Sequence, residues 1–346
     1  MASLFEKIFG KKMAIKRYLR ELHIETSFAC NLSCIMCPMS AQIKGQGLMN
    51  YETFSKILPN ISLFKRVALS GFGEPLIHKE IVKMVYETKK HSVFTNMSTN
   101  GLLLSSNLAK ELIDANLDLI TFSIDAAKKE TYEKIRRGSR FEQVLENIEN
   151  FTNLCLQKGC NTYTQWIYVL MENNLDEVVD ALRLSKELGV IRFVVKHMET
   201  ATDTNELTQA LFNTFLAPDL SKEEIKKRDQ VLDELKSWAE KLKMYLVIHP
   251  IKTKTCIAYP VENLFIDYKG NVSPCCYLTT HSVRPYLKNP ETENFVVGNI
   301  WENSLSRILS NEQYRKFVGG WMKNSIPIEC KGCVQIARMG LNPVRN

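Results

Sequence analysis

The chain has 346 residues, of which 45% are hydrophobic and 24% charged, and its formal net charge at pH 7 is +7. This composition is ordinary for a globular protein, and the length suits one large domain plus a smaller one. Lys and Arg are spread along the chain, so we expect no nucleic-acid binding. No apolar run reaches the roughly 18 residues of a membrane span, and no secretory signal is visible, so we expect a cytoplasmic protein.

Residues 1–19 form a basic amphipathic segment, because apolar side chains such as Leu4, Phe5 and Ile8 stand among Lys and Arg. Two interpretations remain open. The segment is either a helix packed under the main domain, which we favour, or a helix lying on a membrane surface.

Strand-like and helix-like segments alternate over residues 20–197, the predicted main domain. The predicted strands are Leu22–Thr26, Arg66–Ser70, Val93–Ser98, Leu119–Ile124, Tyr163–Leu170 and Ile191–Lys196. The predicted helices are Tyr51–Leu58, His78–Lys89, Asn107–Asn116, Phe141–Gln157 and Leu175–Leu188. Such alternation indicates parallel strands with crossover helices. Six units of this kind make a partial barrel or an open α/β sheet, and ligands bind both at the carboxyl ends of the strands.

Residues 198–244 interrupt this rhythm and are predicted to bridge two domains. Thr200–Leu207 is loop-like, and Ser221–Lys243 is a charged helix whose Ser221 and Glu224 form a capping box. Residues 245–346 are predicted to be a small α+β domain of short strands, turns and cysteines, with a hairpin around Lys269–Asn271.

Ten cysteines gather mainly near the two ends of the chain. In a large chain without a signal peptide, reduced thiols or metal ligands are expected rather than disulfides. The first group is Cys30-x3-Cys34-x2-Cys37, on a loop directly after the first predicted strand. Three thiolates on one loop can hold three corners of a cubane cluster and leave the fourth iron open for a small molecule. A structural zinc site would need a fourth ligand.

This triplet resembles the signature of the radical S-adenosylmethionine (SAM) superfamily. The resemblance covers residues 20–197 and implies a partial (β/α)6 TIM-like barrel with a [4Fe–4S] cluster held by Cys30, Cys34 and Cys37. It also implies that SAM binds the open iron and is cleaved reductively to a 5′-deoxyadenosyl radical. The residue before the third cysteine is often aromatic in the family and borders the adenine. Here it is Met36, whose polarizable thioether can still make that contact.

Further segments follow the predicted strands in the family's order. Gly71-Phe72-Gly73-Glu74-Pro75 resembles the segment that receives the methionine amino group, although a tight turn would look the same. Asn100 follows the third strand, and Ser123 and Asp125 end the fourth. Similar residues contact the ribose and methionine parts of SAM. Arg136 resembles an arginine near the SAM carboxylate, but a solvated charge at a helix end fits equally well. The predicted SAM contacts are therefore Met36, Phe72, Gly73, Glu74, Asn100, Ser123, Asp125 and Arg136.

A second group of cysteines, Cys256, Cys275, Cys330 and Cys333, resembles the C-terminal SPASM/twitch extension of radical SAM enzymes. That resemblance implies an auxiliary [4Fe–4S] cluster, and the number of cysteines favours the shorter, one-cluster twitch form. The alternative is a four-cysteine zinc ribbon. Three other cysteines, Cys155, Cys160 and Cys276, are interpreted as small buried residues; the alternative is a thiol that returns a hydrogen atom to a substrate radical.

The resemblance implies an enzyme that abstracts hydrogen from a substrate, with a one-electron reductant such as flavodoxin or ferredoxin as partner. Four cysteines saturate the auxiliary cluster, so we expect it to transfer electrons rather than bind substrate.

We expect a small molecule of the sugar or cyclitol type to be oxidised or epimerised. A peptide-modifying maturase is the alternative, but only about twenty residues precede the first strand, too few for a precursor-recognition domain. An iron–sulfur carrier without turnover is the second alternative.

Overall fold

A computed structural model describes residues 19–37, 47–197, 221–251, 253–279, 294–331, 333, 335, 336 and 339. The predicted amphipathic segment before Leu19 and the predicted loop Thr200–Leu207 lie outside these residues. The chain divides into two compact units. Unit 1 comprises residues 1–29, 46–96 and 252–346, and unit 2 comprises residues 30–45 and 97–251. The linear division at residues 20, 198 and 245 stays a prediction.

Unit 1 contains a sheet in the order β12-β11-β10-β1-β3-β4. Its strands are β1 (Leu19–Ile24), β3 (Phe64–Ala68), the start of β4 (Phe94–Thr99), β10 (Asn263–Ile266), β11 (Asn271–Ser273) and β12 (Gly298–Asn299). β1 runs parallel to both of its neighbours, so that Leu22 lies opposite Val67 on one side and Leu264 on the other. β10 and β11 form the predicted antiparallel hairpin. Its turn contains Gly270 at φ +88°, a conformation that favours glycine.

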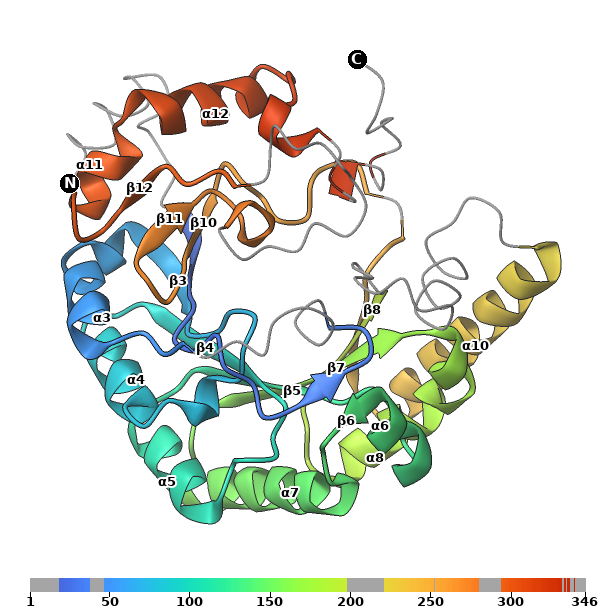
Figure 1. The fold of residues 1–346 in the computed structure, drawn as a ribbon. Helices are drawn as coiled ribbons and strands as arrows, with labels where there is room; N and C mark the ends of the chain where they lie inside the picture. Colours follow the sequence, from blue (N-terminus) through green and yellow to red (C-terminus); the bar gives the residue numbers. More distant parts are fainter. Residues whose placement is uncertain are drawn as a thin grey trace. The chain divides into compact units, whose positions relative to one another are not determined.

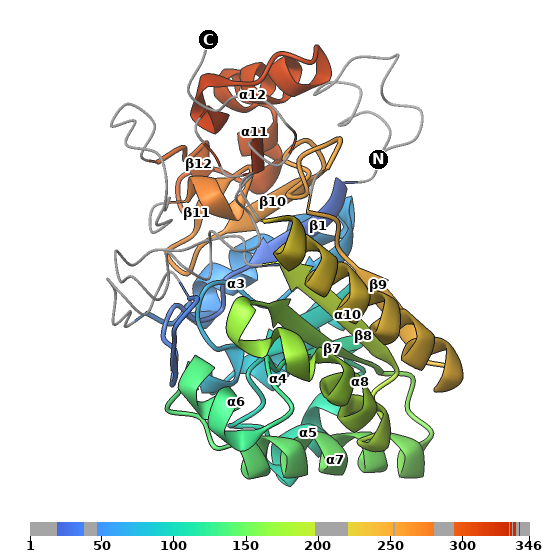
Figure 2. The same cartoon turned by 90° about the vertical axis from the view of Figure 1, so that its right-hand side faces the viewer.

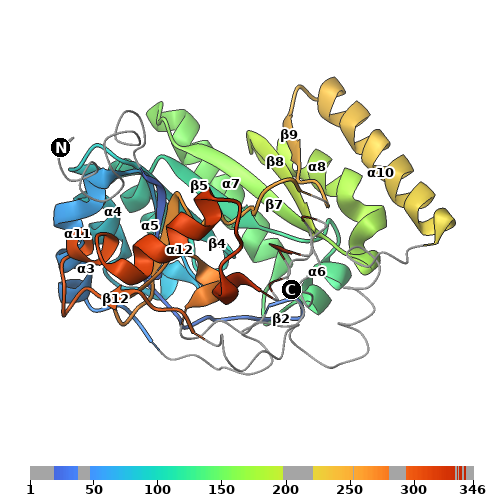
Figure 3. The same ribbon diagram turned by 90° about the horizontal axis from the view of Figure 1, so that it is seen from above.

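Unit 1 contains α-helices and 3-10 turns, and side-chain caps start several of them. They are α3 (Tyr51–Ile57), η1 (Leu58–Leu63), η2 (Pro75–Ile77), α4 (Ile81–Lys89), η4 (Cys276–Leu278), α11 (Leu305–Leu309), α12 (Glu312–Met322) and η6 (Ile328–Cys330). Asn50, Ser304 and Asn311 cap α3, α11 and α12 through their side-chain oxygens. Figure 3 shows α11 and α12 following one another beside β12. α12 buries Tyr314 and Phe317 completely or nearly so, which anchors it.

Unit 2 contains four parallel strands in the order β5-β7-β8-β9. They are β5 (Leu119–Ser123), β7 (Tyr163–Leu170), β8 (Arg192–His197) and β9 (Tyr245–Ile248). The helices are α5 (Ser106–Asp114), α6 (Lys129–Ile135), α7 (Phe141–Lys158), η3 (Glu172–Glu177), α8 (Val178–Glu187) and α10 (Lys222–Lys241). α5, α7 and α8 lie on one side of these strands (Figure 1), and α10 packs along α8 (Figure 2). Their apolar faces cover the sheet, as expected for crossover helices.

Much of this architecture agrees with the sequence-based predictions. All six predicted strands are present, and β7 has the predicted ends. Ser221 caps α10 as predicted, because its Oγ accepts from the Glu224 amide while the Glu224 carboxylate accepts from the Ser221 amide. The predicted helix Leu175–Leu188 begins instead as the 3-10 turn η3. The prediction missed α6 and also a small antiparallel pair in unit 2, β2 (Ser33–Cys34) with β6 (Arg136–Arg137).

The bonding of Cys155 and Cys160 differs from the prediction. They are joined by a disulfide at the C-terminal end of α7, whereas the sequence favoured two small buried thiols. The helix ends at Gly159 in the left-handed conformation, and this turn brings the two sulfur atoms together. Because both sulfurs are bonded to each other, neither residue is a thiol able to return a hydrogen atom.

None of the helices within the described ranges combines the length and apolarity needed to cross a bilayer.

Candidate functional site

The loop that carries Cys30, Cys34 and Cys37 follows β1 and is described in unit 2. Cys30 is exposed, Cys34 is buried and Cys37 is half-buried. The Cys37 amide donates to the Cys34 carbonyl at 3.1 Å, which closes a single turn around the second and third thiols. The first cysteine therefore faces solvent, while the second is enclosed by protein.

Two contacts attach this loop to other segments of unit 2. The Asn100 side-chain amide, just after β4, donates to Asn31 Oδ1 at 2.9 Å. The pairing of β2 with β6 places Cys34 opposite Arg136. The position of the cysteine loop therefore depends on residues distant in sequence.

Arg136 and Asp125 form a buried ion pair beside Cys34. Arg136 Nη2 lies 2.6 Å from Asp125 Oδ2, and Arg136 Nη1 lies 3.9 Å from the Cys34 sulfur. The Val169 amide donates to Asp125 Oδ1 at 2.7 Å and fixes the carboxylate. The Arg136 side chain is therefore a buried, partnered cation, and the interpretation as a solvated helix-end charge is wrong.

Burial and charge act in opposite directions on these groups. Burial alone would lower the pKa of Arg136, but Asp125 and then Cys34 outweigh it, so the pKa lies above its usual value. Burial raises the pKa of the Cys34 thiol to about 12, although Arg136 opposes this shift. The guanidinium thus stabilises a thiolate at a position where burial disfavours one.

Met36, Asn100 and Ser123 are the other predicted SAM contacts in unit 2. Met36 packs with Ile35 and Val169 against the buried pair Ile135 and Met171. Asn100 is buried, and its Oδ1 accepts from the Leu102 amide. Ser123 is half-buried at the end of β5.

The segment Gly71–Pro75 follows β3 in unit 1, and it lies against the chain just before Cys30. A side chain at Gly73 would place its Cβ 2.4 Å from the Ala29 carbonyl oxygen, so only glycine permits this approach. The Glu74 amide donates to the same carbonyl at 2.8 Å. The buried carboxylate of Glu25 accepts from the Phe72 amide at 3.0 Å and from the Tyr268 amide at 3.4 Å.

The side chains of Phe72 and Glu74 have partners within unit 1. The Phe72 ring lies 5.9 Å from the Phe265 ring. Glu74 is buried, and its Oε1 accepts from the Leu76 amide at 3.1 Å, which caps η2.

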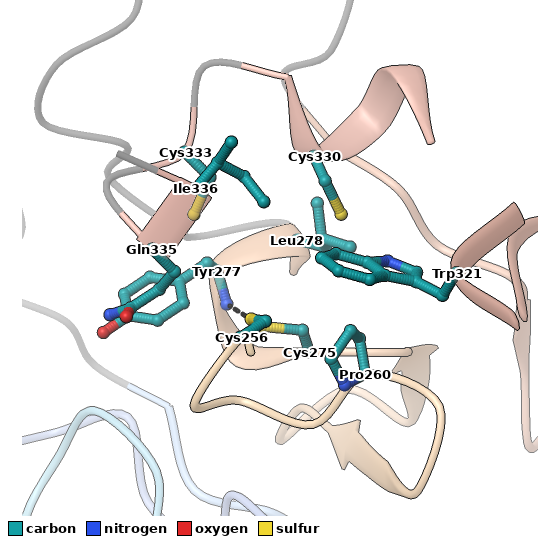
Figure 4. Close-up of a pocket in the computed structure, with 10 residues that line it drawn as sticks. All are labelled: Cys256, Pro260, Cys275, Tyr277, Leu278, Trp321, Cys330, Cys333, Gln335 and Ile336. Atoms are coloured by element: carbon teal, nitrogen blue, oxygen red, sulfur yellow. Dashed lines mark hydrogen bonds between the residues drawn. The ribbon is translucent and has the colours of Figure 1, made fainter. Parts of the chain in front are cut away.

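All four cysteines of the second group line one cavity in unit 1 (Figure 4). Cys256, Cys275 and Cys330 are buried, and Cys333 is half-buried. The Tyr277 amide donates to the Cys275 sulfur at 3.4 Å. Cys276 is half-buried and does not line the cavity, so the geometry selects Cys275 from this adjacent pair.

Three of the four thiols around this cavity have raised pKa values. Burial raises the pKa of Cys256 to about 12 and raises that of Cys330 as well, whereas the Trp321 indole lowers the pKa of Cys330. A hydrogen bond with Cys276, followed by burial, raises the pKa of Cys275. Metal binding at such thiols must displace protons, so affinity for the metal is coupled to pH.

The other residues of the cavity fit an iron–sulfur cluster. The Trp321 indole nitrogen is buried with no oxygen or nitrogen acceptor among the described residues, and both amide atoms of Gln335, a residue that is 0% exposed, are buried without a hydrogen-bond partner. Buried donors without partners are costly, and the sulfur atoms of a cluster accept hydrogen bonds. Within the described part of the chain, no three His, Cys, Asp or Glu side chains converge as ligands of one metal ion. Four cysteines around a cavity of this kind suit a multi-iron group better than one zinc ion.

The predicted ligands and contacts are thus divided between the units. Unit 2 holds Cys30, Cys34, Cys37, Met36, Asn100, Ser123, Asp125 and Arg136, and unit 1 holds Phe72, Gly73, Glu74, Cys256, Cys275, Cys330 and Cys333. Their roles toward cofactors stay predictions. Sequence reasoning missed Glu25, Trp321 and Gln335, since an isolated polar or aromatic residue carries no motif.

Comparison with known proteins identifies the class. Residues 24–185 match the radical SAM superfamily, and residues 256–334 match the SPASM family of iron–sulfur cluster-binding domains. The chain belongs to the radical SAM superfamily and carries a C-terminal SPASM domain. It is therefore an enzyme whose cofactors are SAM, a [4Fe–4S] cluster and auxiliary iron–sulfur, as predicted.

Relatives by sequence have several described activities. A "tungsten-containing aldehyde ferredoxin oxidoreductase cofactor-modifying protein" of Pyrococcus furiosus is 26% identical over 331 residues, covering 91% of this chain and 87% of the relative. A probable GTP 3',8-cyclase of Pyrococcus abyssi is 30% identical over 211 residues, covering 60% of this chain and 66% of the cyclase.

Two solved structures have folds similar to that of this chain. Streptococcus suis SuiB bound to its precursor peptide SuiA has a TM-score of 0.64 at 14% identity, covering 91% of this chain and 70% of SuiB. The structure of anSMEcpe with bound S-adenosylmethionine has a TM-score of 0.65 at 17% identity, covering 92% of this chain and 87% of anSMEcpe. Together with the parallel strands, these likenesses confirm the predicted α/β fold with a partial TIM-like barrel.

Proposed function

We propose that Cys30, Cys34 and Cys37 hold the [4Fe–4S] cluster that binds SAM, and that the enzyme abstracts hydrogen from a small-molecule substrate. The observation that carries this proposal is the placement of a three-cysteine loop after β1, tied to Arg136 at Cys34 and to Asn100 at Asn31. When bound, the cluster and SAM supply a 5′-deoxyadenosyl radical that takes a hydrogen atom from substrate.

The protein's own residues position and enclose this chemistry. Arg136 places a fixed positive charge beside the Cys34 sulfur and, with Asp125, forms a rigid buried pair. Gly73 brings the Gly71–Pro75 backbone against the residue before Cys30, where Glu74 would meet the methionine amino group. In unit 2, Met36 would offer apolar surface to SAM, and Asn100 and Ser123 would offer polar groups after β4 and β5. The fully buried Asp125 would act through Arg136, which it holds in place.

We further propose that Cys256, Cys275, Cys330 and Cys333 hold one auxiliary [4Fe–4S] cluster that serves in electron transfer. Four thiolates occupy all four irons and leave none for substrate. The lining of a single cavity by these four residues supports this set of ligands over one that includes Cys276. A flavodoxin or ferredoxin would supply the electron for SAM cleavage.

The substrate proposal rests on the sequence relatives. The relative aligned over 91% of the chain is described as cofactor-modifying, and the cyclase relatives act on GTP. Neither description names a peptide. We therefore propose a small, hydroxyl-bearing substrate, such as a sugar or cyclitol unit, whose carbon–hydrogen bond is broken during oxidation or epimerisation.

The test of the cluster assignment begins with anaerobic reconstitution, which should load about eight irons and eight sulfides, enough for two cubanes. Joint replacement of Cys30, Cys34 and Cys37 by Ala should leave about four irons and abolish reductive SAM cleavage. Joint replacement of Cys155 and Cys160 by Ser is the matched control and should keep all the iron and full cleavage. Cleavage retained by the first triple variant would refute the proposal.

The substrate class can be tested with a fully deuterated cell extract. Transfer of deuterium into 5′-deoxyadenosine marks the fraction that contains the substrate. We expect transfer from the small-molecule filtrate, and we expect it to survive protease treatment. Transfer only from the peptide fraction would establish a peptide substrate, and absence of transfer from both would favour a carrier without turnover.

A further inference from the structure

Trp321 lies in the last turn of α12, and its indole ring forms one wall of the cavity that the four cysteines line. Figure 4 shows the ring beside Cys330, with its nitrogen on the edge that faces the Cys330 sulfur. The lining also includes the apolar side chains of Pro260, Leu278 and Ile336. An indole placed here could fill space alone, so the important feature is the surroundings of its nitrogen.

The Trp321 nitrogen is buried and has no oxygen or nitrogen acceptor among the residues that the structure describes. A buried donor that is left unpaired destabilises the fold. The sulfur of Cys330 is the group that it faces, and a thiolate accepts a hydrogen bond far better than a neutral thiol does. The N–H is therefore placed for an anionic Cys330, the form in which cysteine ligates iron.

We propose that the Trp321 N–H donates a hydrogen bond to the Cys330 thiolate of the bound auxiliary cluster and raises the reduction potential of that cluster. This inference rests on the proposed function, in which Cys330 is a ligand. One-electron reduction adds negative charge to the cluster and its thiolates, so a donor stabilises the reduced form more than the oxidised form. Hydrogen bonds to sulfur are a recognised means by which proteins set cluster potentials.

The cavity offers few other donors of this kind. The Tyr277 amide donates to Cys275, but it belongs to the backbone and is common to any residue at that position. Gln335 Nε2 is a second buried donor without a partner in this cavity, but Figure 4 shows Trp321 as the donor beside Cys330, so Trp321 is the side chain that we assign to this ligand. An electron left on a substrate radical would be accepted more readily as a consequence.

The experiment uses the full chain with Cys30, Cys34 and Cys37 replaced by Ala, so that only the auxiliary cluster is present. Trp321→Phe in this background keeps an aromatic ring and removes the N–H. Its midpoint potential, from an electron paramagnetic resonance redox titration, should fall so that reduction is about tenfold less favourable, or about 59 mV for one electron. Trp301→Phe is the matched control, because the Trp301 N–H donates to Thr53 Oγ1 at 3.2 Å and its ring does not line the cavity.

The outcomes separate the two proposals. A parent variant without iron would refute the ligand assignment, and this inference with it. A parent that binds four irons, combined with equal midpoints for Trp321→Phe and Trp301→Phe, would overturn this inference alone.

If Trp321→Phe loses the cluster, Trp321→His provides the test, because it keeps a ring N–H on a smaller ring. A His variant that holds the cluster supports the hydrogen bond. Loss of the cluster in both variants would mean that ring volume, not the N–H, is required. In the parent, electron–nuclear double resonance should also detect an exchangeable proton coupled to the reduced cluster, and the Phe variant should lack it.

Discussion

Arg136 Nη2 and Asp125 Oδ2 lie 2.6 Å apart in a fully enclosed pair, and the same guanidinium reaches the sulfur of Cys34. The two side chains are only 8% and 0% exposed, so water contributes almost nothing to their solvation. Removing one partner of a buried pair leaves an uncompensated charge, whereas removing both leaves none. The pair therefore makes each residue dependent on the other.

We predict strong coupling between substitutions at these two positions. Asp125→Asn and Arg136→Gln should each lower the free energy of unfolding by about 3–5 kcal/mol, because each leaves one buried charge. The double variant should lose less free energy of unfolding than the two single variants lose together, with a coupling energy of about 1–3 kcal/mol. Anaerobic urea unfolding followed by circular dichroism measures all four proteins.

Asp176→Asn serves as a control for that cycle, because Asp176 pairs with Lys227 at the surface. Exposed pairs contribute little, so its unfolding midpoint should match that of the parent. Additive losses at positions 125 and 136 would contradict the buried pair.

A second prediction concerns the adjacent residues Cys275 and Cys276. Cys275→Ala should remove about four of eight irons, because its buried sulfur lines the cluster cavity. Cys276→Ala should retain all of them, since Cys276 does not line the cavity. Iron and sulfide analysis after anaerobic reconstitution shows which of the two cysteines is the ligand. Loss of iron in Cys276→Ala but not in Cys275→Ala would make Cys276 the ligand.

A third prediction uses the close approach at Gly73. Gly73→Ala introduces a Cβ 2.4 Å from the Ala29 carbonyl oxygen and 2.5 Å from that of Ser27, both backbone atoms that cannot rotate away. The Gly71–Pro75 segment must then shift, so SAM affinity measured by equilibrium binding should fall at least about tenfold, a loss of about 1.4 kcal/mol. Iron content should stay unchanged.

Gly319→Ala is the matched substitution, since a Cβ there meets no atom within 4 Å and α12 would gain helix propensity. It should leave SAM affinity unchanged and stabilise the protein by up to about 1 kcal/mol. Equal SAM affinities in the two variants would mean that the Gly73 contact is unimportant for binding.

The fourth prediction is a pH dependence at Glu21 on β1. Burial would raise the pKa of Glu21, but His23, Asn96 and Arg66 outweigh it and lower the pKa from 4.5 to about 2. A lowered carboxyl pKa contributes stability that is complete above pH 4.5 and is lost as the pH falls toward about 2.

Glu21→Gln should therefore destabilise the protein by about 1–3 kcal/mol at pH 7 and by the same amount at pH 5. The difference should shrink steadily below pH 4.5. Urea midpoints of both proteins at several pH values test this, and a difference that does not depend on pH would be incompatible with the lowered pKa.

Features of the fold that arise from neighbouring residues were predictable from the sequence. The parallel strands were predictable because apolar runs such as Tyr163–Leu170 alternate with amphipathic helices, a pattern that follows from local chemistry. Capping at Ser221 was predictable for the same reason, since both partners lie within one turn.

The missed features depend on contacts between distant segments. β6 is only Arg136–Arg137, two charged residues with no strand pattern, and it exists because β2 lies opposite. The partner of Arg136, Asp125, lies in the loop after β5, and residue spacing alone could not show whether Arg136 is buried or solvated. Trp321 and Gln335 matter because of the cavity around them, which only the assembled unit defines.

The central position of β1 in its sheet has a consequence for biosynthesis. Leu22 needs Val67 on one side and Leu264 on the other, so one edge of this strand stays unpaired until most of the chain has left the ribosome. Pairings of such long sequence separation form slowly, and open strand edges promote aggregation. Nascent or truncated chains that end before β10 should therefore depend on chaperones, and expression at low temperature should raise the yield of folded protein.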